Sequence, residues 1–198
     1  MEQMLKLCEK YNFEGEFPYA VTEVIKREGG FSNNKFDKGG KTKYGISKRF
    51  VKENEKVLKK CGILDVDDID EFVESLTLEQ AVLIYYRLFW RPLRCEEMNG
   101  IVSTYLFDTA VNSGIYRAVK LLQSSVNAVS EESLVVDGII GNRTISAVNN
   151  IPIIPRLLLE FVSQRVKFYV SIGLKGNNKV FLKGWVNRAL SYNHLINV

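Results

Sequence analysis

The chain has 198 residues, of which 46% are hydrophobic, and its 27 Lys and Arg residues against 23 Asp and Glu residues give a formal net charge of +4. This is enough apolar material for one large domain or two small lobes, while no run of about eighteen apolar residues is present that would insert stably into a membrane. The basic residues are spread along the chain and form no arm for nucleic acid, so a solvated, mildly basic surface suited to another polyanionic partner is expected.

The N-terminal sequence, MEQMLKLCEKYNFEGEF, is too acidic and too interrupted to be a secretory signal. We therefore expect synthesis in the cytoplasm, and work outside it would need a separate route of release. The three cysteines, Cys8, Cys61 and Cys95, are odd in number and lack CxxC spacing, and His194 is the single histidine. Neither a disulfide framework nor a metal site is expected, and no cofactor is implied.

Helical periodicity dominates the first half of the chain. An amphipathic run over residues 17–28 is stopped by Gly29 and Gly30, and a second helix is expected from Ser47 to about residue 60. The acidic segment DVDDIDEF predicts a loop or short turn, and because the EF-hand spacing and its glycine are missing, no calcium site is expected. Thr77 and Gln80 form a capping box ahead of the helical sequence LEQAVLIYYRLFW.

The second half also consists of helical runs. Two helices, over 101–112 and 116–128, are separated by Ser113 and Gly114, and a turn at Asp137 precedes a short helix. After the prolines at 152 and 155, the sequences RLLLEFVSQRVKFYVSIG and KVFLKGWVNRALSY predict the last two helices. Strand-like sequence is confined to the region after Gly30, so the predicted fold is all-α, mainly helical, with one small β-hairpin.

Glu28 introduces the segment EGGFSNNKFDKGGKTKYGIS, in which helical sequence gives way to turn residues. A carboxylate in the last turn of a helix is poorly placed for stability, because the free carbonyl groups there carry roughly half a negative charge. Gly29 and Gly30 allow the backbone to turn sharply after it. An exposed residue at a helix end, with no task, is the alternative interpretation for an isolated glutamate.

Turn residues at 33–34 and at 38–40 would close a short hairpin, which would place Asp37 and Thr42 on a wall facing Glu28. Glycosidic bond cleavage needs a group of this kind, in which an acid protonates the leaving oxygen and a carboxylate opposite it activates water or stabilises the oxocarbenium-like centre. Asp37 has a direct catalytic role or a structural one, bonding hairpin amides. Thr42 holds the attacking water or caps the next turn.

This segment resembles the opening motif of the glycoside hydrolase family 108 lysozymes, which are N-acetylmuramidases found as phage endolysins and bacterial export muramidases. LTLEQAVLIYYRLFWRPL is similar to the next helix of that family, and the sequence from LFDTAVNSG to IIGNRTISAV, with RVKFYVSIG and FLKGWVNRA, resembles the predicted peptidoglycan-binding region that follows. The order Glu, Asp, Thr also resembles the catalytic arrangement of T-even phage lysozymes, where the acid precedes the Asp by nine residues, as Glu28 precedes Asp37 here.

The resemblance implies a lysozyme-like fold in which the hairpin lies next to the catalytic helix and Glu28 is the proton donor. Residues 1–98 would form the catalytic lobe and residues 99–198 a helical peptidoglycan-binding lobe, packed together as one compact unit because no Gly-, Ser- or Pro-rich linker joins them. The implied reaction is hydrolysis of the β-1,4 bond between N-acetylmuramic acid and N-acetylglucosamine. A catalytically silent peptidoglycan-binding protein and a chitinase- or chitosanase-like hydrolase are the alternatives.

Further residues are candidates for binding substrate. Tyr44 would line the sugar groove or pack in the core. Asp108 and Asn112 lie four residues apart on one helical face and predict a cleft wall that binds sugar or peptide groups, the alternative being that Asp108 pairs internally and Asn112 caps the helix. Gln123 on the next helix joins this set. The two tryptophans, at 90 and 185, are core residues or stack on sugar rings.

The partner implied by the resemblance is bacterial peptidoglycan, bound by a monomer. Since no signal sequence is expected, the chain would reach the periplasm or cell wall after release, with help from a holin or a secretion system.

Overall fold

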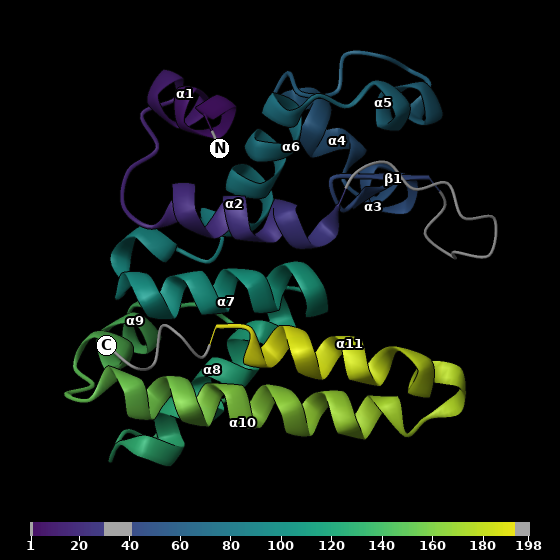
Figure 1. Cartoon of the computed structure of the whole chain (residues 1–198). Helices are drawn as coiled ribbons and strands as arrows, with labels where there is room; N and C mark the ends of the chain where they lie inside the picture. The colour runs from purple at the N-terminus through teal and green to yellow at the C-terminus, as the bar shows by residue number, and fades with distance from the viewer. Residues whose placement is uncertain (1, 30–40, 193–198) are drawn as a thin grey trace. The chain divides into compact units, whose positions relative to one another are not determined.

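The structure is a computed structural model that describes residues 2–29 and 41–192, and these residues fold into two compact units, 1–92 and 93–198 (Figure 1). The described residues are mainly helical and contain one two-stranded antiparallel hairpin. The predicted fold class is therefore confirmed. The expected lobes, 1–98 and 99–198, divide the chain a few residues later than the two units do, and their separate roles stay a prediction.

The first unit begins with two helices, continues through the hairpin, and ends in a helix of two parts. Its elements are α1 (Glu2–Lys10), α2 (Phe17–Glu28), β1 (Thr42–Lys43), β2 (Ile46–Ser47), α3 (Lys48–Glu53), α4 (Glu55–Lys60), α5 (Ile69–Ser75), α6 (Leu78–Tyr85) and η1 (Tyr86–Trp90).

The second unit is helical throughout its described residues. Its elements are η2 (Cys95–Glu97), α7 (Gly100–Ser113), α8 (Ile115–Val129), α9 (Asn142–Asn149), α10 (Ile154–Gly173), η3 (Gly176–Asn178) and α11 (Lys179–Leu190).

The core of the first unit forms around α2. Phe17, Ala20, Val21 and Val24 recur at helical spacing and are all buried, as the periodicity predicted. Trp90 at the end of η1 packs on Phe17, with ring centroids 5.3 Å apart, and its side chain is buried. Trp90 is therefore a core residue.

The predicted helix from Ser47 to residue 60 is divided into α3 and α4. The division falls at Asn54, whose side-chain amide donates a hydrogen bond to the carbonyl of Phe50 at 2.9 Å. A short polar side chain that bonds backbone in this way competes with helix continuation. The acidic segment also differs from the prediction, because the carboxylate of Asp68 caps α5 by accepting hydrogen bonds from two backbone amides.

Helix α6 starts where the sequence predicted. Thr77 and Gln80 form the full capping box, in which the Thr77 hydroxyl accepts from the Gln80 amide and the Gln80 side chain accepts from the Thr77 amide. The helix then continues as η1, which has π-helical geometry, up to Trp90. Such wide turns are rare and occur mostly as single turns inside α-helices.

The second unit is built from helices that pack in sequence order, α7 on α8, α8 on α10 and α10 on α11. Helices α10 and α11 form a hairpin whose arms run side by side (Figure 1). They approach closely at Gly173, where an added Cβ would lie 2.9 Å from Leu182 Cδ1. In the ranges that the structure describes, no helix combines the length and the apolar sequence that a bilayer crossing requires.

Candidate active site

Glu28 is the last residue of α2, as the sequence predicted. The helix ends because Gly29 adopts a φ of 75°, a conformation that glycine reaches without strain, while its amide still donates to the Ile25 carbonyl at 3.1 Å. The Glu28 side chain is half-buried. The end of α2 thus holds a carboxyl group at a fixed position that solvent still reaches.

The hairpin follows in the chain as the sequence TKYGIS. Thr42 pairs with Ser47 and Lys43 with Ile46, so that only Tyr44 and Gly45 remain in the turn. Both turn residues have positive φ, 51° at Tyr44 and 78° at Gly45. This is the pattern of the tight two-residue turn that matches the natural twist of a hairpin, and it favours glycine.

Gly45 lies directly against Glu28. A Cβ added to Gly45 would come within 2.7 Å of Glu28 Cγ and within 2.6 Å of the Tyr85 hydroxyl. That hydroxyl donates a hydrogen bond to the Tyr44 carbonyl at 2.7 Å, which fixes the turn to α6. Helix α2, the hairpin turn and α6 therefore meet at the stem of the Glu28 side chain.

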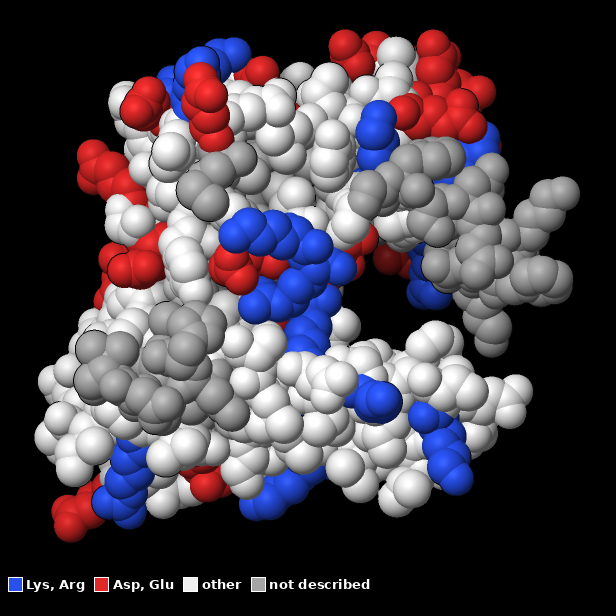
Figure 2. All heavy atoms as spheres, in the orientation of Figure 1, with Lys and Arg blue, Asp and Glu red and all other residues white. Residues whose placement is uncertain are grey.

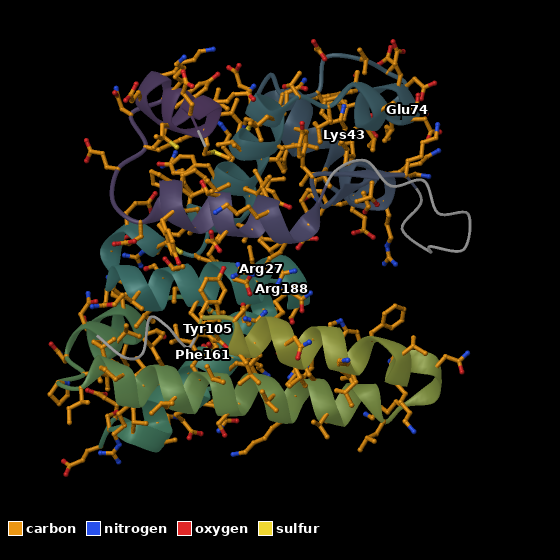
Figure 3. The ribbon with its side chains drawn as sticks, viewed as in Figure 1. Arg27, Lys43, Glu74, Tyr105, Phe161 and Arg188 are labelled. Atoms are coloured by element: carbon orange, nitrogen blue, oxygen red, sulfur yellow. The ribbon has the colours of Figure 1, made fainter. Side chains whose placement is uncertain are left out.

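The hairpin is also tied to α5 by charge. The ammonium group of Lys43 donates to the Glu74 carbonyl at 2.8 Å (Figure 3), and Lys41 forms an ion pair with the Glu74 carboxylate. Lys48 at the start of α3 pairs with Asp70, and the hydrogen bond from Lys48 holds the pKa of the Asp70 carboxyl below its usual value. These pairs are exposed, so their role is to orient the hairpin more than to stabilise the fold.

The other predicted residues of this site fall into two groups. Asp37 and the turn residues at 33–34 and 38–40 lie outside the described residues. Thr42 is half-buried in β1, and Tyr44 is half-buried at the turn, where its backbone is fixed by Tyr85. The catalytic and binding roles of all these residues stay predictions.

Sequence reasoning missed Gly45 and Tyr85. The pair Tyr44-Gly45 between two short strand-forming stretches was a usable signal for the turn, because glycine is favoured there. Tyr85 carried no such signal, since its contact with the hairpin bridges 41 residues of sequence.

Asp108 on α7 lies at the centre of a buried ionic cluster in the second unit. Its carboxylate receives a hydrogen bond from Arg165 at 2.7 Å and pairs with Arg188 at 2.9 Å. Burial by itself would raise the pKa of Asp108, but the two guanidinium groups outweigh it and hold that pKa below its usual value. The internal pairing considered for Asp108 is what the structure shows, and contact with a substrate stays a prediction.

Asn112 and Gln123 also bind other parts of the second unit. The Asn112 carbonyl oxygen accepts a hydrogen bond from the Tyr169 hydroxyl, and Asn112 does not cap α7, which ends at Ser113 with Gly114 as its C-cap. The Gln123 amide donates to Asp137 at 2.8 Å, and its oxygen accepts from the Gly138 amide at 2.9 Å. Gln123 thereby holds the turn before α9, and its contact with a substrate stays a prediction.

Aromatic packing completes the surroundings of the cluster. Tyr105 on α7 and Phe161 on α10 meet edge to face with centroids 4.9 Å apart (Figure 3), and the guanidinium group of Arg165 lies 5.2 Å from the Tyr105 ring.

Comparisons with known proteins cover both units. Residues 21–114 match the family model described as glycosyl hydrolase 108, and residues 117–190 match the model described as a predicted peptidoglycan domain. Among solved structures, the chain is similar to SagA of Brucella abortus, with 27% sequence identity, a TM-score of 0.71, and coverage of 91% of this chain and 93% of that one. No curated protein sequence matches the chain.

Proposed function

We propose that the chain is a lysozyme of the glycosyl hydrolase 108 family, because residues 21–114 match the model of that family and residues 117–190 match the predicted peptidoglycan domain. It would cleave the β-1,4 bond between N-acetylmuramic acid and N-acetylglucosamine, with Glu28 as the general acid. The proposal is carried by the position of Glu28 at the end of α2, where the hairpin turn contacts the stem of its side chain. A carboxyl group held between elements in this way can be aimed at a leaving oxygen.

The second group needed for glycoside hydrolysis is assigned to Asp37, and Thr42 is assigned to hold the attacking water. Support for these roles comes from their spacing after Glu28 and from the position of Thr42 in β1, the first strand after the segment that contains Asp37. Tyr44 is assigned to the groove beside them. No metal ion or cofactor is required for this chemistry.

The site of action is proposed to be the cell wall, reached after release through a holin or a secretion system, and the active form is proposed to be a monomer. Support for the wall as partner comes from the match of residues 117–190 to the predicted peptidoglycan domain.

The test is the lysis of purified cell walls, followed by turbidity, reducing-sugar release and mass spectrometry of the fragments. We expect the parent to release fragments ending in N-acetylmuramic acid, and Glu28→Gln to lower lysis by at least about a hundredfold, the lower limit for loss of a general acid. Glu23→Gln removes another carboxylate from α2 and should lyse walls like the parent. Near-normal lysis by Glu28→Gln would remove Glu28 from the mechanism.

The same assay separates the alternatives. Asp37→Ala should lower lysis by a comparable or smaller factor while wall binding remains. If the parent binds walls without releasing sugar, the chain is a silent binder. If it acts on chitin or chitosan and not on walls, it is a hydrolase of another glycan.

A further inference from the structure

Basic residues are spread along the whole chain, but acidic residues are absent from its C-terminal part. Glu160 is the last acidic residue, and six of the 27 Lys and Arg residues follow it. Residues 1–160 therefore hold 21 basic residues against all 23 acidic ones, so the positive net charge belongs to the segment that forms most of α10 and α11. A charged segment of a single sign favours a partner of the opposite sign.

Four lysines of this segment face solvent. They are Lys167, Lys175, Lys179 and Lys183, all exposed and without an ion pair among the described residues. The two arginines, Arg165 and Arg188, are instead paired with Asp108. The visible surface over the end of α11 next to η3 shows basic atoms and no acidic ones (Figure 2). These lysines are available to an anionic partner.

A row of aromatic rings runs along the same hairpin. Phe181 and Trp185 on α11 are stacked with centroids 5.8 Å apart, and Trp185 stacks on Tyr169 of α10 at 5.7 Å. Tyr169 is buried and its hydroxyl receives a hydrogen bond from Arg165 at 2.8 Å. The inner end of the row is thus fixed, while Phe181 at its outer end is 56% exposed.

Gly184 precedes Trp185 on α11, and neither its backbone conformation nor the packing around it requires glycine. It is in the interior of α11, where glycine weakens a helix relative to alanine. A Cβ added to it would meet nothing within 4 Å, and its φ is not in the positive range that requires glycine. Glycine at such a position leaves bare backbone to which a ligand can come close.

Phe181, Gly184 and Trp185 are spaced i, i+3 and i+4 and therefore share one side of the helix. We call these three residues the α11 face. It contains two stacked rings and the exposed backbone of Gly184, and Lys179 and Lys183 are nearby in sequence.

We propose that the α11 face is a binding subsite for the glycan strand of peptidoglycan, an inference that rests on the proposed function. A sugar ring stacks on Phe181, the exposed outer end of the row, which Trp185 supports, and the strand passes over Gly184. The lysines of the hairpin attract the carboxylates of the stem peptides. Charge complementarity favours this occupant, because the segment after Glu160 has no acid to repel an acidic glycan, and the flat aromatic surface fits the apolar face of a sugar ring.

Binding to purified insoluble walls tests the subsite, with Glu28→Gln as the background so that no substrate is consumed. Phe181→Ala should weaken binding by about two- to tenfold, the range for one aromatic contact. Leu174→Ala is the matched control, since Leu174 is 73% exposed and precedes α11, outside the α11 face. It should bind like the background protein.

Gly184→Ala separates a binding role from a structural one. The methyl group has free space and alanine favours helix, so the melting temperature should equal or exceed that of the background protein while wall binding weakens. Lys179→Gln with Lys183→Gln should lower binding at low salt and make it less salt-dependent. The pair Lys52→Gln and Lys56→Gln, exposed lysines of the first unit, is the control for charge.

Wall binding by Phe181→Ala and Gly184→Ala equal to that of the background protein would overturn the subsite. It would also be overturned if Leu174→Ala and Phe181→Ala reduced binding to anionic phospholipid vesicles alike and left wall binding unchanged, because the hairpin would then be a membrane contact. The lysis assay on the parent is independent of these results. If the parent lyses walls but the variants bind walls as well as the background protein, only the proposed subsite is wrong. If the parent does not lyse walls but the variants bind them more weakly, only the proposed hydrolase activity is wrong.

Discussion

Gly45 in the hairpin turn lies so close to Glu28 at the end of α2 that even a methyl group on Gly45 would come within 2.7 Å of Glu28 Cγ. The two residues are distant in the chain, with Asp37 between them in the sequence. The position of the proposed acid therefore depends on a glycine that has no chemical group of its own.

Gly45→Ala should both destabilise the fold and reduce wall lysis. The left-handed backbone costs an L-residue about 1–2 kcal/mol, and the overlap with Glu28 and Tyr85 adds about 1–3 kcal/mol, as overpacking does. Displacement of Glu28 should lower lysis at least about tenfold. Urea unfolding and the turbidity assay measure the two effects.

Gly29→Ala is the matched control for stability, because Gly29 has a similar φ of 75° but nothing within 4 Å of an added Cβ. It should show the backbone cost alone. Equal stability of the two alanine variants would mean that the contact between Gly45 and Glu28 is not tight in solution.

Arg165→Met should lower the unfolding free energy by up to about 3–5 kcal/mol, the range for breaking a buried ion pair, because the buried Asp108 carboxylate then keeps only Arg188 as its charged partner. Arg165 and Asp108 are both fully buried and 2.7 Å apart. Arg156→Met removes an exposed arginine from the same helix and should change stability little. Chemical denaturation at neutral pH compares the two, and similar losses for both would show that the buried pair contributes nothing particular.

Stability should fall in acid partly because of Asp108. Its folded pKa is held below the ordinary value, so the unfolded chain binds the proton first as the pH drops. The stabilisation is complete above the unfolded pKa of about 3.9 and is lost as the pH falls through the lower folded pKa. Asp108→Asn should be less stable than the parent at pH 7 but should lose less on going to pH 3. Urea midpoints at the two pH values measure this, and parallel losses in both proteins would contradict it.

Gln123→Ala should loosen the turn that precedes α9. It removes the hydrogen bonds that Gln123 makes with Asp137 and Gly138, which costs about 1–3 kcal/mol for the two bonds together. Hydrogen exchange of the amides at 138 and 139 should speed up relative to those of α8. Gln164→Ala is the control. It removes a half-buried glutamine of α10 whose side-chain amide donates to Glu160, and it should leave the turn unchanged.

Local sequence was enough to predict most of the helices and the end of α2. Glycine after Glu28, the capping box at Thr77 and the break near Pro155 act within one or two turns of helix, so their effect can be predicted without the rest of the chain. The division of the helix at Asn54 was missed because a side chain bonding its own backbone leaves no trace in hydrophobic periodicity.

In the candidate site, too, some features follow from local sequence and others depend on tertiary contacts. The sequence by itself determined that a glutamate ends α2, since the end of a helix depends on neighbouring residues. The turns predicted around Asp37 lie outside the described residues. Only the tertiary structure decided that Tyr85 from α6 fixes the turn at Tyr44, and that Asp108 pairs with Arg165 and not with solvent. These contacts join segments far apart in the chain. They form because burial of a polar or charged group requires a partner, and which partner is in reach depends on how the helices pack.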